Sequence, residues 1–158
     1  MTTEQLAKLL TEHSFTEGFW PEHIEKLAAM ASVARFAADE LIFHEGDRSS
    51  LFYLIQEGNV ALEVVTPGRA VRVSTLYGGA VLGWSSVVDT ERKQFQARAL
   101  EPVRAIGFDG ARLRHACEAD FGFGFAFMRA VLKVMAGRVH DTRQQLQEIY
   151  SPVATGAD

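Results

Sequence analysis

Apolar residues follow a helical period at both ends of the chain. Over residues 1–31 this spacing predicts two helices. Over residues 110–150 it predicts a short helix capped by Asp109, followed by a long helix that begins near Phe121. Residues 151–158 are small or polar, which predicts a loose tail.

Between the helical segments, residues 33–109 show the alternation of apolar and polar positions that is typical of strands. Val60, Leu62 and Val64 alternate with their neighbours, and Pro67-Gly68 marks a turn into the next strand. About eight short strands spaced near ten residues apart are typical of an antiparallel sandwich or barrel. Since 158 residues suffice for one ordinary domain and not two, we predict a single, mainly β domain with flanking helices.

The long predicted helix carries a seven-residue repeat. Its positions are separated alternately by four and three residues, at Met128, Leu132, Met135, Val139, Thr142, Leu146 and Ile149. This spacing is typical of a two-stranded coiled coil, so we predict a homodimer formed through the positions from Leu132 to Ile149. The alternative is that this line belongs to the core of one chain. A second apolar line is suited to packing against the sheet, and it consists of Phe127, Val131 and Val134.

Several short motifs occur in a characteristic order along the chain. They are Phe43–Asp47, Phe52–Val60, Leu82-Gly83, Ala97-Arg98-Ala99 and the segment from Met135 to Thr142. Together they resemble the cyclic nucleotide-binding domain and, more narrowly, the sensor half of the CRP/FNR-like regulators. The resemblance covers residues 15 to 150. It implies an eight-stranded antiparallel β-roll of jelly-roll type, two N-terminal helices and a long C-terminal dimerisation helix.

The resemblance also implies a ligand-binding cassette that begins at Gly83. In the family, the next residue is a glutamate that accepts a hydrogen bond from the ribose, and a later Arg-Ala pair neutralises the cyclic phosphate. Here Trp84 follows the glycine, and an indole cannot accept that hydrogen bond. The Arg-Ala pair is absent as well. We therefore expect weak or no binding of cyclic AMP.

The candidate ligand-binding residues lie in this altered cassette and on the long helix. They are Gly83, Trp84, Ser85, Ser86, Arg92, Lys93 and Thr142. The two serines are expected to open a short helix that holds an anion, and Arg92 to make a bidentate contact with it. One alternative places Arg92 and Lys93 on a solvated loop. Another assigns Thr142 to the register of the dimer instead of to contact with a purine.

Composition and charge narrow the functional classes. With 16 Lys and Arg against 20 Asp and Glu, the net charge is -4, which argues against direct DNA binding. The residues after Tyr150 are too few for the family's winged helix, so we expect a stand-alone sensor or a truncated one. One cysteine rules out a disulfide framework, and the five histidines lack metal-ligand spacing. Since no catalytic motif, signal peptide or membrane span is found, we expect a cytoplasmic protein that is not an enzyme.

These observations predict a regulatory sensor or interaction module that binds an altered small ligand or a protein partner. No resident cofactor is expected, and a cyclic nucleotide or another small anion is the candidate ligand. Two alternatives stay open. One is a receptor for cyclic AMP or cyclic GMP with a modified cassette. The other is an accessory subunit with a structural role and no ligand.

Overall fold

The computed structural model describes residues 1–48, 50–88 and 92–150. Its helices are α1 (Thr3–Glu12), the 3-10 helix η1 (Ser14–Thr16), α2 (Pro21–Met30), α3 (Ser85–Val88), α4 (Gly110–Ala119) and α5 (Phe121–Tyr150). Its strands are β1 (Ser32–Phe36), β2 (Leu41–Phe43), β3 (Leu51–Glu57), β4 (Val60–Thr66), β5 (Arg69–Leu76), β6 (Val81–Leu82), β7 (Gln96–Ala99) and β8 (Val103–Asp109). The predicted tail, residues 151–158, lies outside the described residues.

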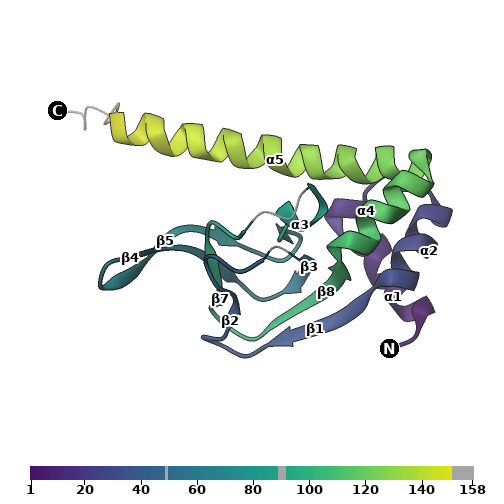
Figure 1. Ribbon diagram of the computed structural model, residues 1–158, viewed down its shortest axis with the longest axis horizontal. Coiled ribbons are helices and arrows are strands. Elements are labelled where there is room, and N and C mark those ends of the chain that lie inside the picture. The colour runs from purple at the N-terminus through teal and green to yellow at the C-terminus, as the bar shows by residue number, and fades with distance from the viewer. Residues whose placement is uncertain (49, 89–91, 151–158) are drawn as a thin grey trace, which may run out of the picture.

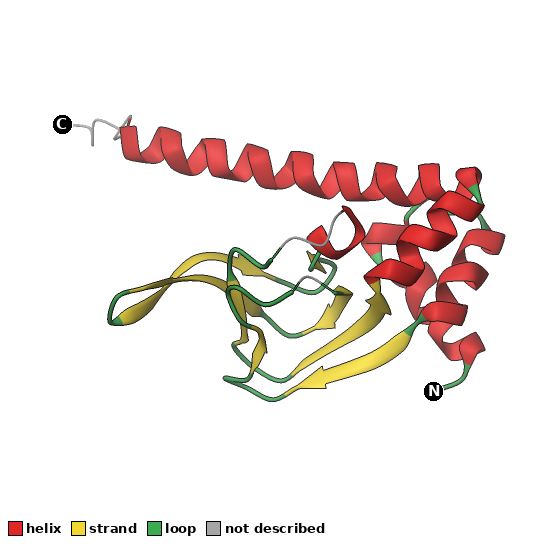
Figure 2. Ribbon diagram, viewed as in Figure 1, coloured by secondary structure: helices red, strands yellow, loops and turns green. Residues whose placement is uncertain are grey.

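The described strands form two four-stranded antiparallel sheets. Their orders are β1-β8-β3-β6 and β2-β7-β4-β5. Figure 1 shows α1, α2 and α4 gathered at one end of the strands, with α5 running along the roll. Figure 2 shows most of the helices at one end of the strands, with the short α3 beside the roll and α5 extending over it. The predicted eight-stranded antiparallel roll with flanking helices is therefore confirmed.

Strand β3 separates two apolar clusters. Phe52 and Leu54 belong to the cluster that lies against the helices, whereas Tyr53 and Ile55 belong to the cluster inside the roll. Because successive side chains of a strand point to opposite faces, a strand that is buried on both faces needs apolar residues at every position. This explains why residues 52–55 form a continuous apolar run instead of an alternating one.

Two local features explain how the chain turns within the roll and how it leaves the roll. Gly58, between β3 and β4, has a φ of +92°, and a Cβ there would lie 2.5 Å from the Pro102 carbonyl oxygen and 2.9 Å from Val103. Only glycine fits this turn without displacing its neighbours. At the end of β8, the Asp109 carboxylate accepts hydrogen bonds from the backbone N–H groups of Ala111 and Arg112. The predicted helix cap is therefore confirmed.

The first half of α5 is anchored to the rest of the chain. The Phe127 ring is fully buried, with its centroid 5.4 Å from those of Phe15 and Phe52. Val131 is buried beside it and Val134 is half-buried, so the predicted second apolar line does pack against the sheet. Although α5 has 30 residues, neither it nor another helix in the described ranges is apolar enough over its length to cross a membrane.

The seven-residue repeat of α5 is largely uncovered in the single chain. Leu132, Val139, Leu146 and Ile149 are exposed by 69%, 60%, 48% and 68%. The alternative that these four residues belong to the chain's own core is therefore wrong. Met135 differs from them because it is half-buried against the helix-side cluster.

Candidate functional site

A pocket of about 640 Å³ lies between the roll, the cassette and α5. This size is typical of small-molecule sites. Its polar lining includes Lys93 and Gln94 of the cassette, together with Arg138 and Thr142 of α5. The apolar lining comes from the roll, the cassette and α5, and consists of Phe43, Leu62, Val73, Leu82, Trp84, Phe95, Met135 and Val139.

The cassette turns sharply at Gly83, which has a φ of +80°. A Cβ at this position would collide with the Leu51 carbonyl oxygen and would lie 3.2 Å from Lys93 Nζ. The glycine therefore both permits the turn and leaves room for the lysine amine. Its role is structural, since it has no side chain to offer a ligand.

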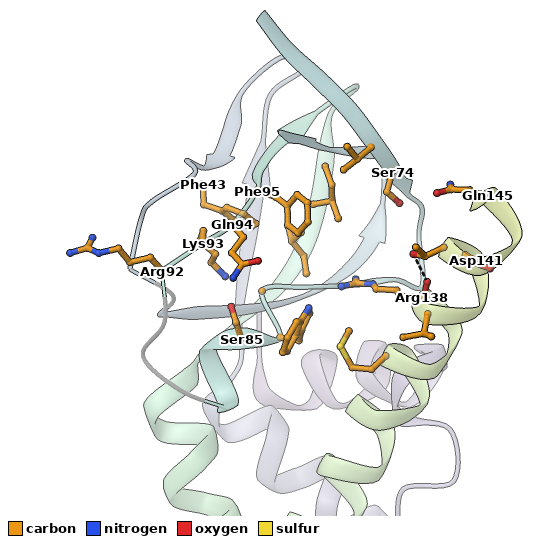
Figure 3. A pocket seen from close by; sticks show the side chains of 18 of the residues that line it. Phe43, Ser74, Ser85, Arg92, Lys93, Gln94, Phe95, Arg138, Asp141 and Gln145 are labelled. Carbon is orange, nitrogen blue, oxygen red and sulfur yellow. Dashed lines mark hydrogen bonds between the residues drawn. The ribbon is translucent and has the colours of Figure 1, made fainter. Parts of the chain in front are cut away.

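The two serines of α3 have different positions. Ser85 lines the pocket, and Figure 3 shows it on the same side as Lys93. Ser86 is buried and does not line the pocket, because its hydroxyl donates a 2.7 Å hydrogen bond to the Gly83 carbonyl oxygen. The expectation that both serines contact an anion therefore needs correction: Ser86 closes the cassette turn, and only Ser85 faces the pocket.

The side chains of Arg92 and Lys93, although adjacent in sequence, have different surroundings. Arg92 is exposed and Nη1 donates a 2.9 Å hydrogen bond to the Gly46 carbonyl oxygen, so the guanidinium is directed away from the pocket in Figure 3. Lys93 is only 8% exposed, with Nζ 4.5 Å from the centroid of the Phe43 ring. The solvated-loop alternative is therefore wrong for Lys93. Both residues line the pocket, but Lys93 is the buried one of the two, whereas the Arg92 guanidinium is bound to Gly46.

The Lys93 amine is electrostatically unusual. Among the described residues, no hydrogen-bond acceptor reaches Nζ. Burial lowers the pKa of Lys93 to about 8, although the negative charge of Asp47 partly offsets this effect. The group is therefore still mostly protonated at neutral pH, and a buried ammonium without an acceptor favours an anion that would supply one.

Arg138 is a pocket residue that the sequence analysis missed. Its guanidinium, on α5, is half-buried and donates a hydrogen bond to the Val81 carbonyl oxygen of β6. Burial lowers the pKa of this arginine. The signal was present in the sequence: Arg138 continues the four-and-three spacing of the sheet-facing line after Phe127, Val131 and Val134. An arginine at such a position indicates a polar partner on the facing strand.

Thr142 lies one turn further along α5 at the edge of the pocket. It is exposed, and its hydroxyl donates a 2.9 Å hydrogen bond to the Arg138 carbonyl oxygen (Figure 3). The hydroxyl oxygen still has a lone pair that can accept a bond from a ligand. Its position therefore allows either of the two roles considered for it, at the pocket or at the dimer seam.

Arg98 of β7 belongs to one of the family-like motifs, but it does not line the pocket and binds other groups of the chain. Its Nε donates to the Glu63 carboxylate over 3.2 Å, and Nη1 donates to the Asp39 carbonyl oxygen over 2.9 Å. Gln96 donates to the same carboxylate over 2.8 Å. The two bonds to Glu63 join β4 and β7 and explain the polar residues within the second sheet.

Comparisons with known proteins agree with this architecture. The family model described as the cyclic nucleotide-binding domain matches residues 33–120, more than half of the chain. No curated protein matches the sequence.

Three solved structures illustrate the similarity. A protein of Geobacter metallireducens GS-15 described as a cyclic nucleotide-binding protein is 26% identical, with a TM-score of 0.74 over 89% of this chain and 99% of that one. The N-terminal domain of a transcriptional regulator from Streptomyces coelicolor A3(2) is 24% identical, with a TM-score of 0.68 over 86% and 95%. A cyclic nucleotide-binding domain from Methylobacillus flagellatus KT is 17% identical, with a TM-score of 0.78 over 98% and 85%.

The first similarity supports the family, and the other two show the fold alone. The model match reaches from β1 to the C-terminal end of α4 and includes the whole cassette. Domains of this kind are regulatory modules. The chain belongs to the cyclic nucleotide-binding domain family.

Proposed function

We propose that this protein is a regulatory sensor whose pocket binds a small anionic ligand other than an ordinary cyclic nucleotide. The observation that carries the proposal is the buried Lys93 ammonium, which lines the pocket and has no acceptor among the described residues. A ligand anion would satisfy it. Trp84 lines the same pocket where a ribose hydroxyl would need an acceptor, so the cassette disfavours a nucleotide.

The proposal includes a homodimer formed by α5. The exposed apolar line that begins at Leu132 extends toward the N-terminus of α5 through Met128, Phe125 and Phe121, with the same spacing. The two phenylalanines are 70% and 84% exposed and were not included in the predicted seam. A second copy of the helix, bearing the same line, would cover this surface.

Pocket and seam share residues, which would allow a ligand to influence the dimer. Met135, Val139 and Thr142 line the pocket and also belong to the seven-residue repeat. A ligand that contacts these side chains would change the seam directly, without a long chain of intermediate contacts. Such differential contact is what allows a ligand to shift a population of states.

Calorimetric titration of the full chain with cyclic AMP and cyclic GMP tests the ligand class. We expect weak or no heat of binding for either nucleotide. A sub-micromolar dissociation constant for cyclic AMP with Trp84 present would overturn the proposal.

The second candidate function is a cyclic-nucleotide receptor with a modified cassette. The match of the family model across the cassette favours it. The same titration separates the two candidates, because only this one predicts tight binding of an unmodified cyclic nucleotide.

A further inference from the structure

We propose that the ligand is an amphipathic organic monoanion with a compact anionic head and an apolar body, of the class of medium-chain or aromatic carboxylates. Lys93 would bind the head, and the apolar wall beneath α5 would hold the body. This inference rests on the proposed function, and it names the chemical class of the anion.

The charges around the pocket indicate a single negative charge on the ligand. Among the other cations that line the pocket, Arg92 is turned outward to Gly46, Arg143 is exposed, and Arg138 already donates to the Val81 carbonyl oxygen. Lys93 is therefore the buried cation that still requires an acceptor among the described residues. One carboxylate matches one such ammonium, whereas a second negative charge would meet only cations that are exposed or that already donate to a carbonyl oxygen.

The position of the head follows from the polar groups. Figure 3 shows Lys93, Gln94 and Ser85 on one side of the pocket, and Asp141 and Gln145 on the other. The Asp141 carboxylate of α5 would repel an anion beside that helix, where Arg143 is exposed and Arg138 already donates to the Val81 carbonyl oxygen. The head therefore lies beside Lys93, with the Gln94 amide within the same part of the pocket, and the body extends toward α5.

The walls between these two sides favour an apolar body. Phe43, Leu62 and Leu82 come from the roll, Trp84 and Phe95 from the cassette region, and Met135 from α5. A ribose and a purine carry several hydroxyl, amine and ring nitrogen groups that would lose water against such walls. Methylene or aromatic groups gain free energy from the same burial. The pocket volume of about 640 Å³ accommodates a body of roughly ten carbons.

The experiment is a set of calorimetric titrations of the full chain at pH 7. The probes are decanoate and 2-naphthoate, their neutral counterparts 1-decanol and 2-naphthalenemethanol, and the polar anion ribose 5-phosphate. We expect at least one carboxylate to bind at least tenfold more tightly than its neutral counterpart and than ribose 5-phosphate. The two carboxylates distinguish an aliphatic body from an aromatic one.

Variants of the chain then test whether Lys93 binds the carboxylate. Lys93→Met should weaken binding of the preferred carboxylate at least tenfold, and Lys93→Arg should retain part of the affinity. Lys8→Met, a matched loss of one positive charge on the exposed face of α1, should leave the affinity unchanged. Circular dichroism and thermal unfolding establish that each variant is folded.

The outcomes separate this inference from the proposed function. If ribose 5-phosphate binds through Lys93 and both carboxylates fail, the pocket takes an anion of another class and this inference is wrong. The inference also fails if the neutral probes bind as tightly as the carboxylates. If cyclic AMP binds tightly instead, both this inference and the proposed function are wrong.

Discussion

The two halves of α5 share one type of sequence pattern but have different surroundings. In the N-terminal half, Phe123, Phe127 and Val131 are buried against the helices and the first sheet. In the C-terminal half, every side chain from Val139 to Tyr150 is exposed. Both halves repeat apolar residues at intervals of four and three. The difference shows that periodicity identifies an apolar face of a helix but does not determine what covers it.

The candidate pocket lies where the two halves meet. Arg138 is half-buried there, between half-buried Met135 and exposed Val139. A ligand in this pocket would therefore contact the point at which α5 leaves the chain's own core. The following predictions test each half of the helix and then the pocket between them.

The largest effect is expected in the buried half. Phe127→Ala should lower the free energy of unfolding by about 3–5 kcal/mol, because it leaves a cavity among packed aromatic rings. Leu146→Ala, in protein diluted until it is monomeric, should change it by less than about 0.5 kcal/mol. Urea unfolding followed by circular dichroism measures both. Equal losses for the two variants would contradict the distinction between the halves.

The exposed half should control assembly. Val139→Asp combined with Leu146→Asp should weaken the dimer at least about 100-fold, or by roughly 2.7 kcal/mol, because like charges would face each other across the seam. Gln144→Asp with Gln147→Asp adds the same charge outside the repeat and serves as the control. Light scattering gives the oligomeric state. If the unmodified chain is monomeric at tens of micromolar, the predicted dimer through α5 is wrong.

In the pocket between the two halves of α5, Lys93→Met should raise the free energy of unfolding by up to about 3 kcal/mol at pH 7. Because the folded pKa of about 8 lies below the unfolded value of 10.5, the unfolded chain binds more protons between these values. The stability of the unmodified protein should therefore rise from pH 8 to pH 10.5, and the advantage of the variant should disappear over that range. Thermal unfolding at several pH values measures this. A variant less stable than the parent at pH 7 would indicate that the ammonium has a partner.

Replacement of the indole should restore part of nucleotide recognition. Trp84→Glu supplies an acceptor for a ribose hydroxyl, worth ~1–3 kcal/mol, so the affinity for cyclic AMP should increase roughly tenfold to a hundredfold. Trp20→Glu, at an exposed position outside the pocket, is the matched control. Calorimetry measures both variants. No gain with Trp84→Glu would mean that the rest of the pocket also rejects the nucleotide.

The smallest effect is a dependence of anion binding on pH. Affinity for the preferred carboxylate should be constant below about pH 8 and then fall about tenfold per pH unit, as Lys93 loses its proton. The other charged groups near the pocket are Asp47, Arg92, Arg138, Asp141 and Arg143. Lys93→Arg should remove the dependence. A pH-independent affinity in the unmodified chain would exclude Lys93 as the binding group.

Local patterns in the sequence were sufficient to predict the elements of the fold. Alternation over residues 33–109 indicated the strands, and a short side chain before a helical segment located the Asp109 cap. These features depend on backbone geometry and on near neighbours, so a short window of sequence carries them. The spacing along α5 likewise identified its two apolar lines before any contact was known.

Only the tertiary structure decided which polar groups face the pocket. Arg92 and Lys93 are adjacent and chemically similar, yet one donates to Gly46 at the surface and the other is buried against Phe43. Neighbouring residues of an extended segment point in opposite directions, and the side that becomes buried depends on strands and helices remote in sequence. The same reason applies to Ser86, turned toward Gly83, and to Arg138, whose acceptor lies 57 positions away on β6.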